Sequence, residues 1–340
     1  MSTFIETTHQ SKGVRHSIVE GKFEISPRMQ KLIEYSQSLS ISGKRNLYTA
    51  NEEQLMYHWT DKCNAILPQS GDWGFDRSEG MALGDHGIRI DLGIDFPKLN
   101  EVPSHVEEYR MDGLSWGKDY AFLLDNHPIE IHPNELITGE CHWEMNEIRK
   151  YDFGDEVFEL AHKARELGAG GTSHGHTCSD LGIGIKEGWG GILERIEKSL
   201  ALYTRLNQKN RMTYLQGLKL VCESIIRYIK RYSDRAFELA SEETDPEQKA
   251  RYEKIGENCA YIATNPPATF HQAIQWIQFA VMTDRMVGHG NGYGRIDLYL
   301  NDLYENDLKE NRITRDEARE YLAEMFLKLR GQFFALGGRL

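Results

Sequence analysis

Apolar side chains recur at helical spacing through most of the second half of the chain. Residues that repeat every three or four positions share one face of a helix and can pack against a core. The spacing predicts helices over 192–205, 214–240 and about 269–284, one that runs from 246 to the prolines at 266 and 267, and one from 315 onward. The side chains predicted to face the core are Tyr252, Ile255, Cys259, Ile262, Trp276, Phe279, Met282, Ala318, Tyr321, Leu322, Met325 and Leu329.

Two of these helices carry recognisable start signals. Asp245 precedes Pro246, and an aspartate can cap free backbone N–H groups while proline suits the first helical position. Prolines after Asn265 end the same helix because they lack a backbone donor and crowd the preceding turn. Thr314 and Glu317 have the spacing of a capping box, in which each side chain satisfies the other residue's backbone.

The first half of the chain is less regular. Residues 1–25 are polar and are predicted to form a loose arm, and 28–66 have an interrupted helical pattern. Glycine and aspartate are frequent over 68–95, which favours loops. Residues 129–140 are predicted to form short extended segments, and the glycines of 288–294 predict a loop between helices.

Composition narrows the class of protein. The chain has 340 residues, 40% of them hydrophobic, so a large core is possible. Its net charge of −12 argues against a nucleic-acid partner. No apolar run approaches the roughly 18 residues that suggest a membrane span, and the N-terminus lacks a signal-peptide core. Five scattered cysteines without a CxxC pair favour reduced thiols, and we expect a cytoplasmic protein.

The segment 172–180, with His174 and His176, is the most unusual polar cluster. A His-x-His pair can bind a metal ion, although no third ligand with convincing spacing accompanies it. The same residues could form a polar substrate-binding loop, or simply hydrogen-bond the nearby backbone. The glycines of 168–171 lack the lysine of a phosphate-binding loop and do not predict a nucleotide site.

The second cluster is the glycine-rich segment 288–295, which contains His289 and Arg295. Closely spaced glycines let the backbone approach a ligand, the histidine could transfer a proton, and the arginine could pair with a carboxylate. A flexible turn between two helices explains the segment equally well. Ordinary nucleophile motifs, such as Gly-x-Ser-x-Gly and His-Glu-x-x-His, are absent from the sequence.

Four segments, in this order, resemble segments of the glycyl radical enzymes of the pyruvate formate-lyase-like family. Residues 133–140 (PNELITGE) are similar to the family's Pro-Asp-Glu-Leu-Ile-x-Gly segment, and 175–192 to its Gly-His-x-x-Pro-Asp block. Residues 259–275 resemble its proline-broken helix pair, and 288–299 (GHGNGYGRIDLY) its Gly-His-Ser…Gly-Arg-x-Asp-Gln-Tyr segment. The resemblance covers about 120–340.

The resemblance implies an α/β fold rich in helix, with 26–340 forming the N-terminal half of a roughly ten-stranded barrel that is incomplete at its C-terminus. In the family, a radical SAM activating enzyme installs a glycyl radical, which passes to a cysteine near the middle of the barrel. None of the cysteines here has that context, and residues 334–338 (FALGG) resemble a segment that precedes the cysteine loop. No cofactor is expected to bind this chain directly.

The resemblance also implies a substrate site. His176 and His289 match histidines that contact substrate hydroxyl groups in the dehydratase branch, and Thr177 and Arg295 lie in the same two motifs. Elimination of water needs one group to accept a proton and another to protonate the leaving hydroxyl, a task suited to histidine.

Three positions depart from the family pattern, and they leave the substrate open. Ser179 stands where proline is common, Gly290 replaces serine and Leu298 replaces glutamine.

Three functions follow from the sequence. The first is the substrate-binding part of a radical dehydratase or C–X lyase acting on a small polar metabolite, which needs a C-terminal half or a complete homologue to react. The second is a non-catalytic pseudoenzyme or interaction subunit. The third is a metal-dependent enzyme using His174 and His176.

Overall fold

The computed structural model describes residues 25–41, 101–149 apart from 109 and 142–144, a few positions between 156 and 167, 178–287 and 292–334. These residues form helices and irregular connections, and no strand occurs among them. The helices are α1 (Pro27–Ile41), α3 (Pro103–Val106), α4 (Gly113–Asn126), α5 (Met145–Ile148), α7 (Leu181–Arg205), α8 (Lys209–Glu242), α9 (Pro246–Ile262), α10 (Phe270–Arg285), α11 (Ile296–Lys309) and α12 (Arg315–Phe334). The expected richness in helix is confirmed, whereas the expected barrel strands have no counterpart in the described ranges.

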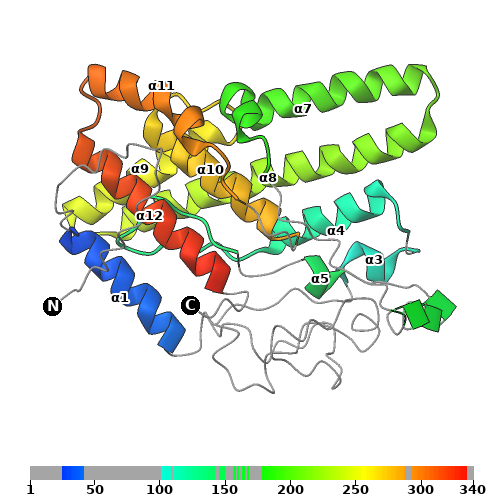
Figure 1. Cartoon of the computed structure of the whole chain (residues 1–340), viewed down its shortest axis with the longest axis horizontal. Coiled ribbons are helices and arrows are strands. Elements are labelled where there is room, and N and C mark those ends of the chain that lie inside the picture. Colours follow the sequence, from blue (N-terminus) through cyan, green and yellow to red (C-terminus); the bar gives the residue numbers. More distant parts are fainter. Residues whose placement is uncertain are drawn as a thin grey trace, which may run out of the picture.

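Helices α8 and α10 lie at the centre of the described helices (Figure 1). The long helices α7 and α8 form an antiparallel hairpin, and α8 also packs against α4 and α9. Helix α10 contacts α7, α9, α11 and α12, and α1 lies against α12. The ring of Phe279 on α10 lies 5.2 Å from that of Tyr232 on α8, and both side chains are fully buried. This aromatic contact joins α8 to α10.

Helices α4 and α8 approach closely because each presents a glycine. A Cβ atom on Gly117 would lie 2.5 Å from the carbonyl oxygen of Gly217, and a Cβ on Gly217 would overlap the carbonyl of Gly113. Real Cβ atoms do not approach backbone atoms this closely. The two backbones can therefore touch only where neither residue has a side chain.

The predicted starts of α9 and α12 are confirmed. Asp245 accepts a hydrogen bond from the backbone N–H of Glu247 (3.0 Å), and Pro246 opens α9. Thr314 and Glu317 form the predicted capping box, with the Glu317 carboxylate accepting from the Thr314 backbone N–H at 2.7 Å. The predicted core side chains are buried or pack against the core.

The middle of the chain contains more helix than its pattern predicts. Helix α7 begins at Leu181 and not near 192, since Asp180 caps its first turn by accepting from Gly182 N–H (3.0 Å). At Gly188 the backbone leaves helical geometry, with φ 64° and ψ 174°, and α7 bends there. Helices α4 and α11 are not predicted by the spacing at all.

Residues 129–140, predicted to be extended segments, form an irregular connection without a strand. Side chains of distant helices satisfy its backbone. The amide of Gln275 accepts from Thr138 N–H and donates to Thr138 C=O, both at 2.8 Å. Glu324 accepts from the N–H groups of Leu136 (2.8 Å) and Ile137 (2.9 Å). The segment is thus held by helices and needs no neighbouring strand.

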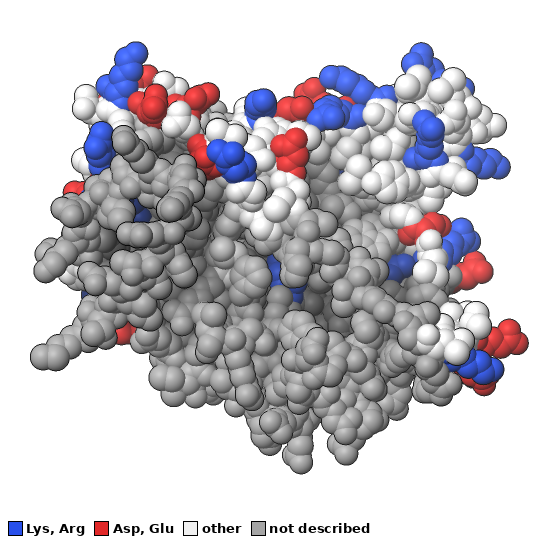
Figure 2. Space-filling model, in the orientation of Figure 1, with Lys and Arg blue, Asp and Glu red and all other residues white. Residues whose placement is uncertain are grey.

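Charged side chains of both signs lie on the described surface that Figure 2 shows. None of the described helices is long and apolar enough to cross a membrane.

Candidate functional site

The structure describes one of the four predicted substrate-binding residues, Arg295. His176, Thr177 and His289 lie outside the described residues, as does His174 of the metal hypothesis. Nearly all of the polar arm predicted over 1–25, the second part of the interrupted helical pattern of 28–66, the loops of 68–95 and the end of the chain from 335 also lie outside them.

The described parts of the two histidine motifs lie against each other. A Cβ atom on Gly292 would meet the Sγ of Cys178 at 3.1 Å, and one on Gly294 would lie 3.9 Å from the Cβ of Cys178. Gly294 has φ 60°, a conformation that suits glycine. Because both positions face Cys178 without a side chain of their own, the two segments can pack closely. The fold thereby joins two motifs that are far apart in the sequence.

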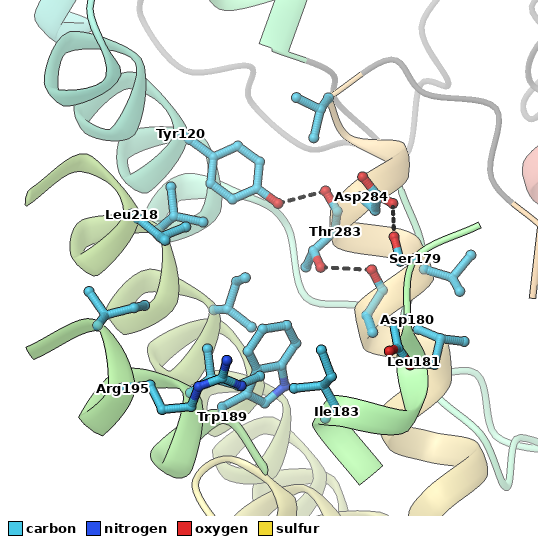
Figure 3. Close-up of a pocket in the computed structure, with 18 of the residues that line it drawn as sticks. Tyr120, Ser179, Asp180, Leu181, Ile183, Trp189, Arg195, Leu218, Thr283 and Asp284 are labelled. Carbon is cyan, nitrogen blue, oxygen red and sulfur yellow. Dashed lines mark hydrogen bonds between the residues drawn. The ribbon is translucent and has the colours of Figure 1, made fainter. Parts of the chain in front are cut away.

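The first motif is also attached to the end of α10. The hydroxyl of Ser179 donates to the Asp284 carboxylate at 2.8 Å, as Figure 3 shows. The next residue, Asp180, caps α7. Proline, which is common at this position in the family, has no hydroxyl and could not make the first contact. Ser179, one of the departures noted above, therefore has a defined structural role.

Arg295 lies at the start of α11 and pairs with Asp297. Its guanidinium donates to both carboxylate oxygens, at 2.9 and 2.6 Å, and its side chain is 67% exposed. Hydrogen bonding from Arg295 lowers the pKa of Asp297 below its ordinary value. A substrate carboxylate would have to compete with Asp297 for this guanidinium, so a binding role for Arg295 stays a prediction.

A cavity of about 560 Å³ opens beside this junction, between α4, α7, α8 and α10. Ser179 and Asp284 lie together on one side of the cavity and Arg195 lies beside Trp189 on another (Figure 3), while apolar side chains form most of the remaining described lining.

Two stacked aromatic pairs flank the cavity. Trp189 and Trp276 have ring centroids 5.1 Å apart, and Trp116 and Tyr120 are 5.3 Å apart. Burial raises the pKa of Tyr120 far above its ordinary value, and its hydroxyl donates to the Thr283 carbonyl at 2.6 Å, so it remains a neutral donor.

Sequence reasoning missed this cavity. It correctly placed Trp276 in the core, where the side chain is 3% exposed, but not at the edge of an opening. The signal lay in the order Trp276, Ala280 and Asp284 along one helix face, where a small residue separates an aromatic ring from a carboxylate. Four helices distant in sequence must pack before such an opening exists.

A second polar cluster lies beneath the 133–140 motif. The ammonium of Lys328 is 2.6 Å from Glu135 and 3.5 Å from Glu140. Burial, with neighbouring carboxylates, raises the pKa of Glu135 to about 7, although Lys328 opposes the shift. Burial alone would lower the pKa of Lys328, but the carboxylates of Glu135, Glu140 and Glu324 outweigh it and raise that pKa. The contacts of this cluster fix the motif in place.

The same cluster reaches α1 and α10. Arg28 donates to Glu324 (2.5 Å) and to the carbonyl of Asn134 (2.6 Å), which attaches α1 to the motif. Burial lowers the pKa of His271 to about 4, and its Nε2 lies 2.8 Å from the Leu136 carbonyl. His271 is therefore a neutral structural histidine at physiological pH.

Two of the described cysteines are unsuited to act as nucleophiles. Burial raises the pKa of Cys222 to about 12 and that of Cys259 still further, so neither is a thiolate near neutral pH. Cys178 is exposed and Cys141 is partly buried. Within the described ranges, no three His, Cys, Asp or Glu side chains are grouped to hold a metal ion.

Known proteins share both the sequence pattern and the fold. Isethionate sulfite-lyase of Nitratidesulfovibrio vulgaris is 37% identical over 149 residues, 42% of this chain and 18% of the relative. Trans-4-hydroxy-L-proline dehydratase of Clostridioides difficile is 32% identical over 165 residues, 46% of this chain and 21% of the relative. The matched stretch thus spans about a fifth of each curated relative.

A crystal structure of a glycyl radical enzyme from Archaeoglobus fulgidus matches 68% of this chain and 37% of its own, with a TM-score of 0.57 and 20% identity. This likeness supports the fold. A family model described as pyruvate formate lyase-like matches residues 144–336, more than half of the chain. The chain therefore belongs to the pyruvate formate lyase-like family, among the glycyl radical enzymes that its four ordered motifs resemble.

Proposed function

We propose that this chain forms the substrate-binding part of a glycyl radical dehydratase or C–X lyase that acts on a small polar metabolite. The observation that carries the proposal is the contact between the two histidine motifs at Cys178 and Gly292, beside the end of α10. The names of the relatives point to the same chemistry, since one is a lyase acting on isethionate and another a dehydratase acting on trans-4-hydroxy-L-proline.

In this proposal His176 and His289 hold the substrate hydroxyl groups. One imidazole accepts a proton from the hydroxyl that is retained, and the other delivers a proton to the hydroxyl that leaves. Thr177 adds a neutral hydrogen bond, and Arg295 pairs with an anionic group if that group displaces Asp297.

Residues 26–340 would form the N-terminal part of the family's α/β barrel, preceded by a polar arm over 1–25. The family's radical-loop motifs do not occur among these 340 residues, so in this proposal the thiyl cysteine and the glycyl residue come from residues outside them. A radical SAM activating enzyme would then be a partner.

Binding tests the site directly. We expect isothermal titration calorimetry with glycerol, isethionate and trans-4-hydroxy-L-proline to reveal one preferred ligand. His176→Ala and His289→Ala should each weaken it about tenfold or more, because a charged or polar contact in a desolvated site contributes about 1.5–3 kcal/mol. His105→Asn, on α3, is the matched control. Undiminished affinity in both site variants would refute the assignment.

Anaerobic incubation with a radical SAM activating enzyme tests the catalytic part. We expect no glycyl radical doublet by electron paramagnetic resonance from this chain alone. A doublet would contradict the proposal that the glycyl residue lies outside these 340 residues. Metal analysis of the same sample tests the alternative, a metal-dependent enzyme. Stoichiometric metal that is lost on His174→Ala would favour that alternative.

A further inference from the structure

Two buried indole N–H groups in the wall of the cavity lack a hydrogen-bond acceptor. They belong to Trp189 on α7 and Trp276 on α10, whose stacked rings both line the cavity. Trp276 is only 3% exposed, and neither Nε1 atom has a partner among the described residues. An indole N–H can only donate, and a donor that is buried without an acceptor costs free energy. An acceptor group that enters the cavity would remove this cost.

Arg195 adds a positive charge on the same side of the cavity. Its Nη1 donates to both carboxylate oxygens of Glu187, at 3.0 and 3.1 Å. This contact turns the side chain back along α7, so that it lies beside Trp189 (Figure 3). Its Nη2 and Nε atoms have no partner among the described residues, and the side chain is 59% exposed. A ligand can therefore bind this guanidinium without displacing Glu187.

The two acidic side chains of the described lining are engaged elsewhere. Asp284 accepts from the Ser179 hydroxyl, and Asp180 accepts from the N–H of Gly182. Asp284 also lies eight residues beyond Trp276 on α10, which is about 12 Å along the helix axis. An anion that binds beside the two tryptophans would therefore not meet an unpaired carboxylate of the described lining.

An apolar wall extends from the tryptophan pair along the α7–α8 hairpin. Ile192 and Ile196 are four residues apart on α7, and Leu218, Val221 and Ile225 recur every three or four residues on α8. Each set therefore lies on one face of its helix. The seven residues from Leu218 to Ile225 span about 10 Å of helix. An aliphatic chain that lies along this wall would remove apolar surface from water.

We propose that the cavity binds a medium-chain aliphatic carboxylate, with its head group at Trp189, Trp276 and Arg195 and its chain along the apolar wall. A carboxylate has about four lone-pair positions, enough for all three donor groups. Its hydrogen bonds from a guanidinium are about twice as strong as those between neutral groups. The cavity volume of about 560 Å³ suits a small organic molecule. The inference goes beyond the proposed function, because it uses none of the residues assigned there.

Isothermal titration calorimetry of the full chain tests the head group. The probes are octanoate and octanamide, which share the aliphatic chain and differ in charge. We expect octanoate to bind at least about tenfold more tightly, because a hydrogen bond to a charged group contributes more than one to a neutral group. Equal or weaker binding of octanoate would overturn the inference. Binding of neither probe would also overturn it and would leave the indole N–H groups to ordered water.

A shorter acid tests the apolar wall. Butanoate has the same head group as octanoate and four fewer methylene groups. We expect it to bind at least about tenfold more weakly, because even one methylene in an apolar pocket changes affinity by about tenfold or more. Equal affinity for the two acids would refute binding of the chain along the wall.

Two glutamine variants locate the carboxylate. Arg195→Gln removes the guanidinium at an exposed position, and it should weaken octanoate about tenfold and leave octanamide unchanged. Lys198→Gln makes the same change of charge on the same helix, at a side chain that is 76% exposed and absent from the described lining. This control should change neither affinity. An equal loss of octanoate affinity in both variants would indicate a general effect of charge and overturn the inference.

Trp189→Phe tests the indole donor. Phenylalanine keeps an aromatic ring beside Trp276 but has no N–H group. Because no described residue accepts from the Trp189 N–H, the free protein loses no hydrogen bond, and circular dichroism checks that the variant is folded. We expect octanoate affinity to fall several-fold. Unchanged octanoate affinity in both Trp189→Phe and Arg195→Gln would contradict the assigned head-group site.

Discussion

Replacing Gly117 by alanine tests the close approach of α4 and α8. The new Cβ atom would lie 2.5 Å from the Gly217 oxygen and 2.7 Å from the Gly217 Cα. Ordinary contact begins near 3.4 Å, so the helices would have to separate by about 0.9 Å (3.4 − 2.5). Both clashing atoms belong to the backbone of α8, and no side-chain rotation relieves the overlap.

Two opposing effects decide whether Gly117→Ala raises or lowers the free energy of unfolding. Alanine stabilises a helix interior by about 1 kcal/mol relative to glycine. Overpacking a tight interface costs about 1–3 kcal/mol, and a clash between a side chain and backbone lies near the upper limit. We therefore expect Gly117→Ala to lower the free energy of unfolding by about 1–2 kcal/mol.

Equilibrium urea unfolding, followed by circular dichroism, measures this change. Gln216→Ala is the control, since it is exposed on α8 beside the contact and should change stability by less than about 0.5 kcal/mol. A Gly117→Ala protein at least as stable as the wild type would refute the steric reasoning, because helix propensity would then have prevailed.

Three further predictions concern buried groups. Lys328→Met should cost about 3–5 kcal/mol at pH 8 and less at pH 5.5, because loss of the ammonium raises the Glu135 pKa further above its unfolded value of 4.5, so that at the higher pH the variant must either bind a proton or bury an unpaired charge; a pH-independent cost would contradict this. The pKa of His271 is instead lowered to about 4 in the folded protein. Between pH 6.5 and 4 the imidazole therefore binds a proton only in the unfolded chain, and the stability of the folded protein should fall as the pH drops through this range. Thermal melts of His271→Gln should lose this pH dependence. Cys178 should react rapidly with Ellman's reagent in the folded protein, whereas Cys222 should react only on unfolding. Cys178→Ser is the control, and reaction of Cys222 in the folded protein would contradict its burial.

The sequence predicted best those helices whose ends carry chemical signals. Helix α9 is bounded by Asp245 and Pro246 at one end and by prolines at the other, so tertiary contacts were not needed to find it. The first part of α7 was missed because its frequent glycines disfavour helix. Two of these glycines have tertiary roles that no local pattern reveals. Gly184 leaves room for the Trp276 ring, and Gly188 leaves room for the backbone of Asn265.

The candidate site was predictable only in part. Its motifs could be located by resemblance, and their contact through Cys178 and Gly292 agrees with a shared site. The cavity could not be predicted, because it depends on how four helices pack. The irregular form of 129–140 was equally hidden, since alternating isoleucines do not reveal whether a strand or a set of helix side chains pairs with the backbone.

The attachment of 136–138 to Gln275 and Glu324 has a consequence for how the chain folds. Local residues cannot give this segment its structure, since its backbone partners are far along the chain on α10 and α12. It should therefore become ordered late, after both helices have docked. In native-state hydrogen exchange, the amides of Ile137 and Thr138 should open together with those two helices and not with the neighbouring connection. The exchange rates of this irregular segment would then measure the cooperativity of the helical core.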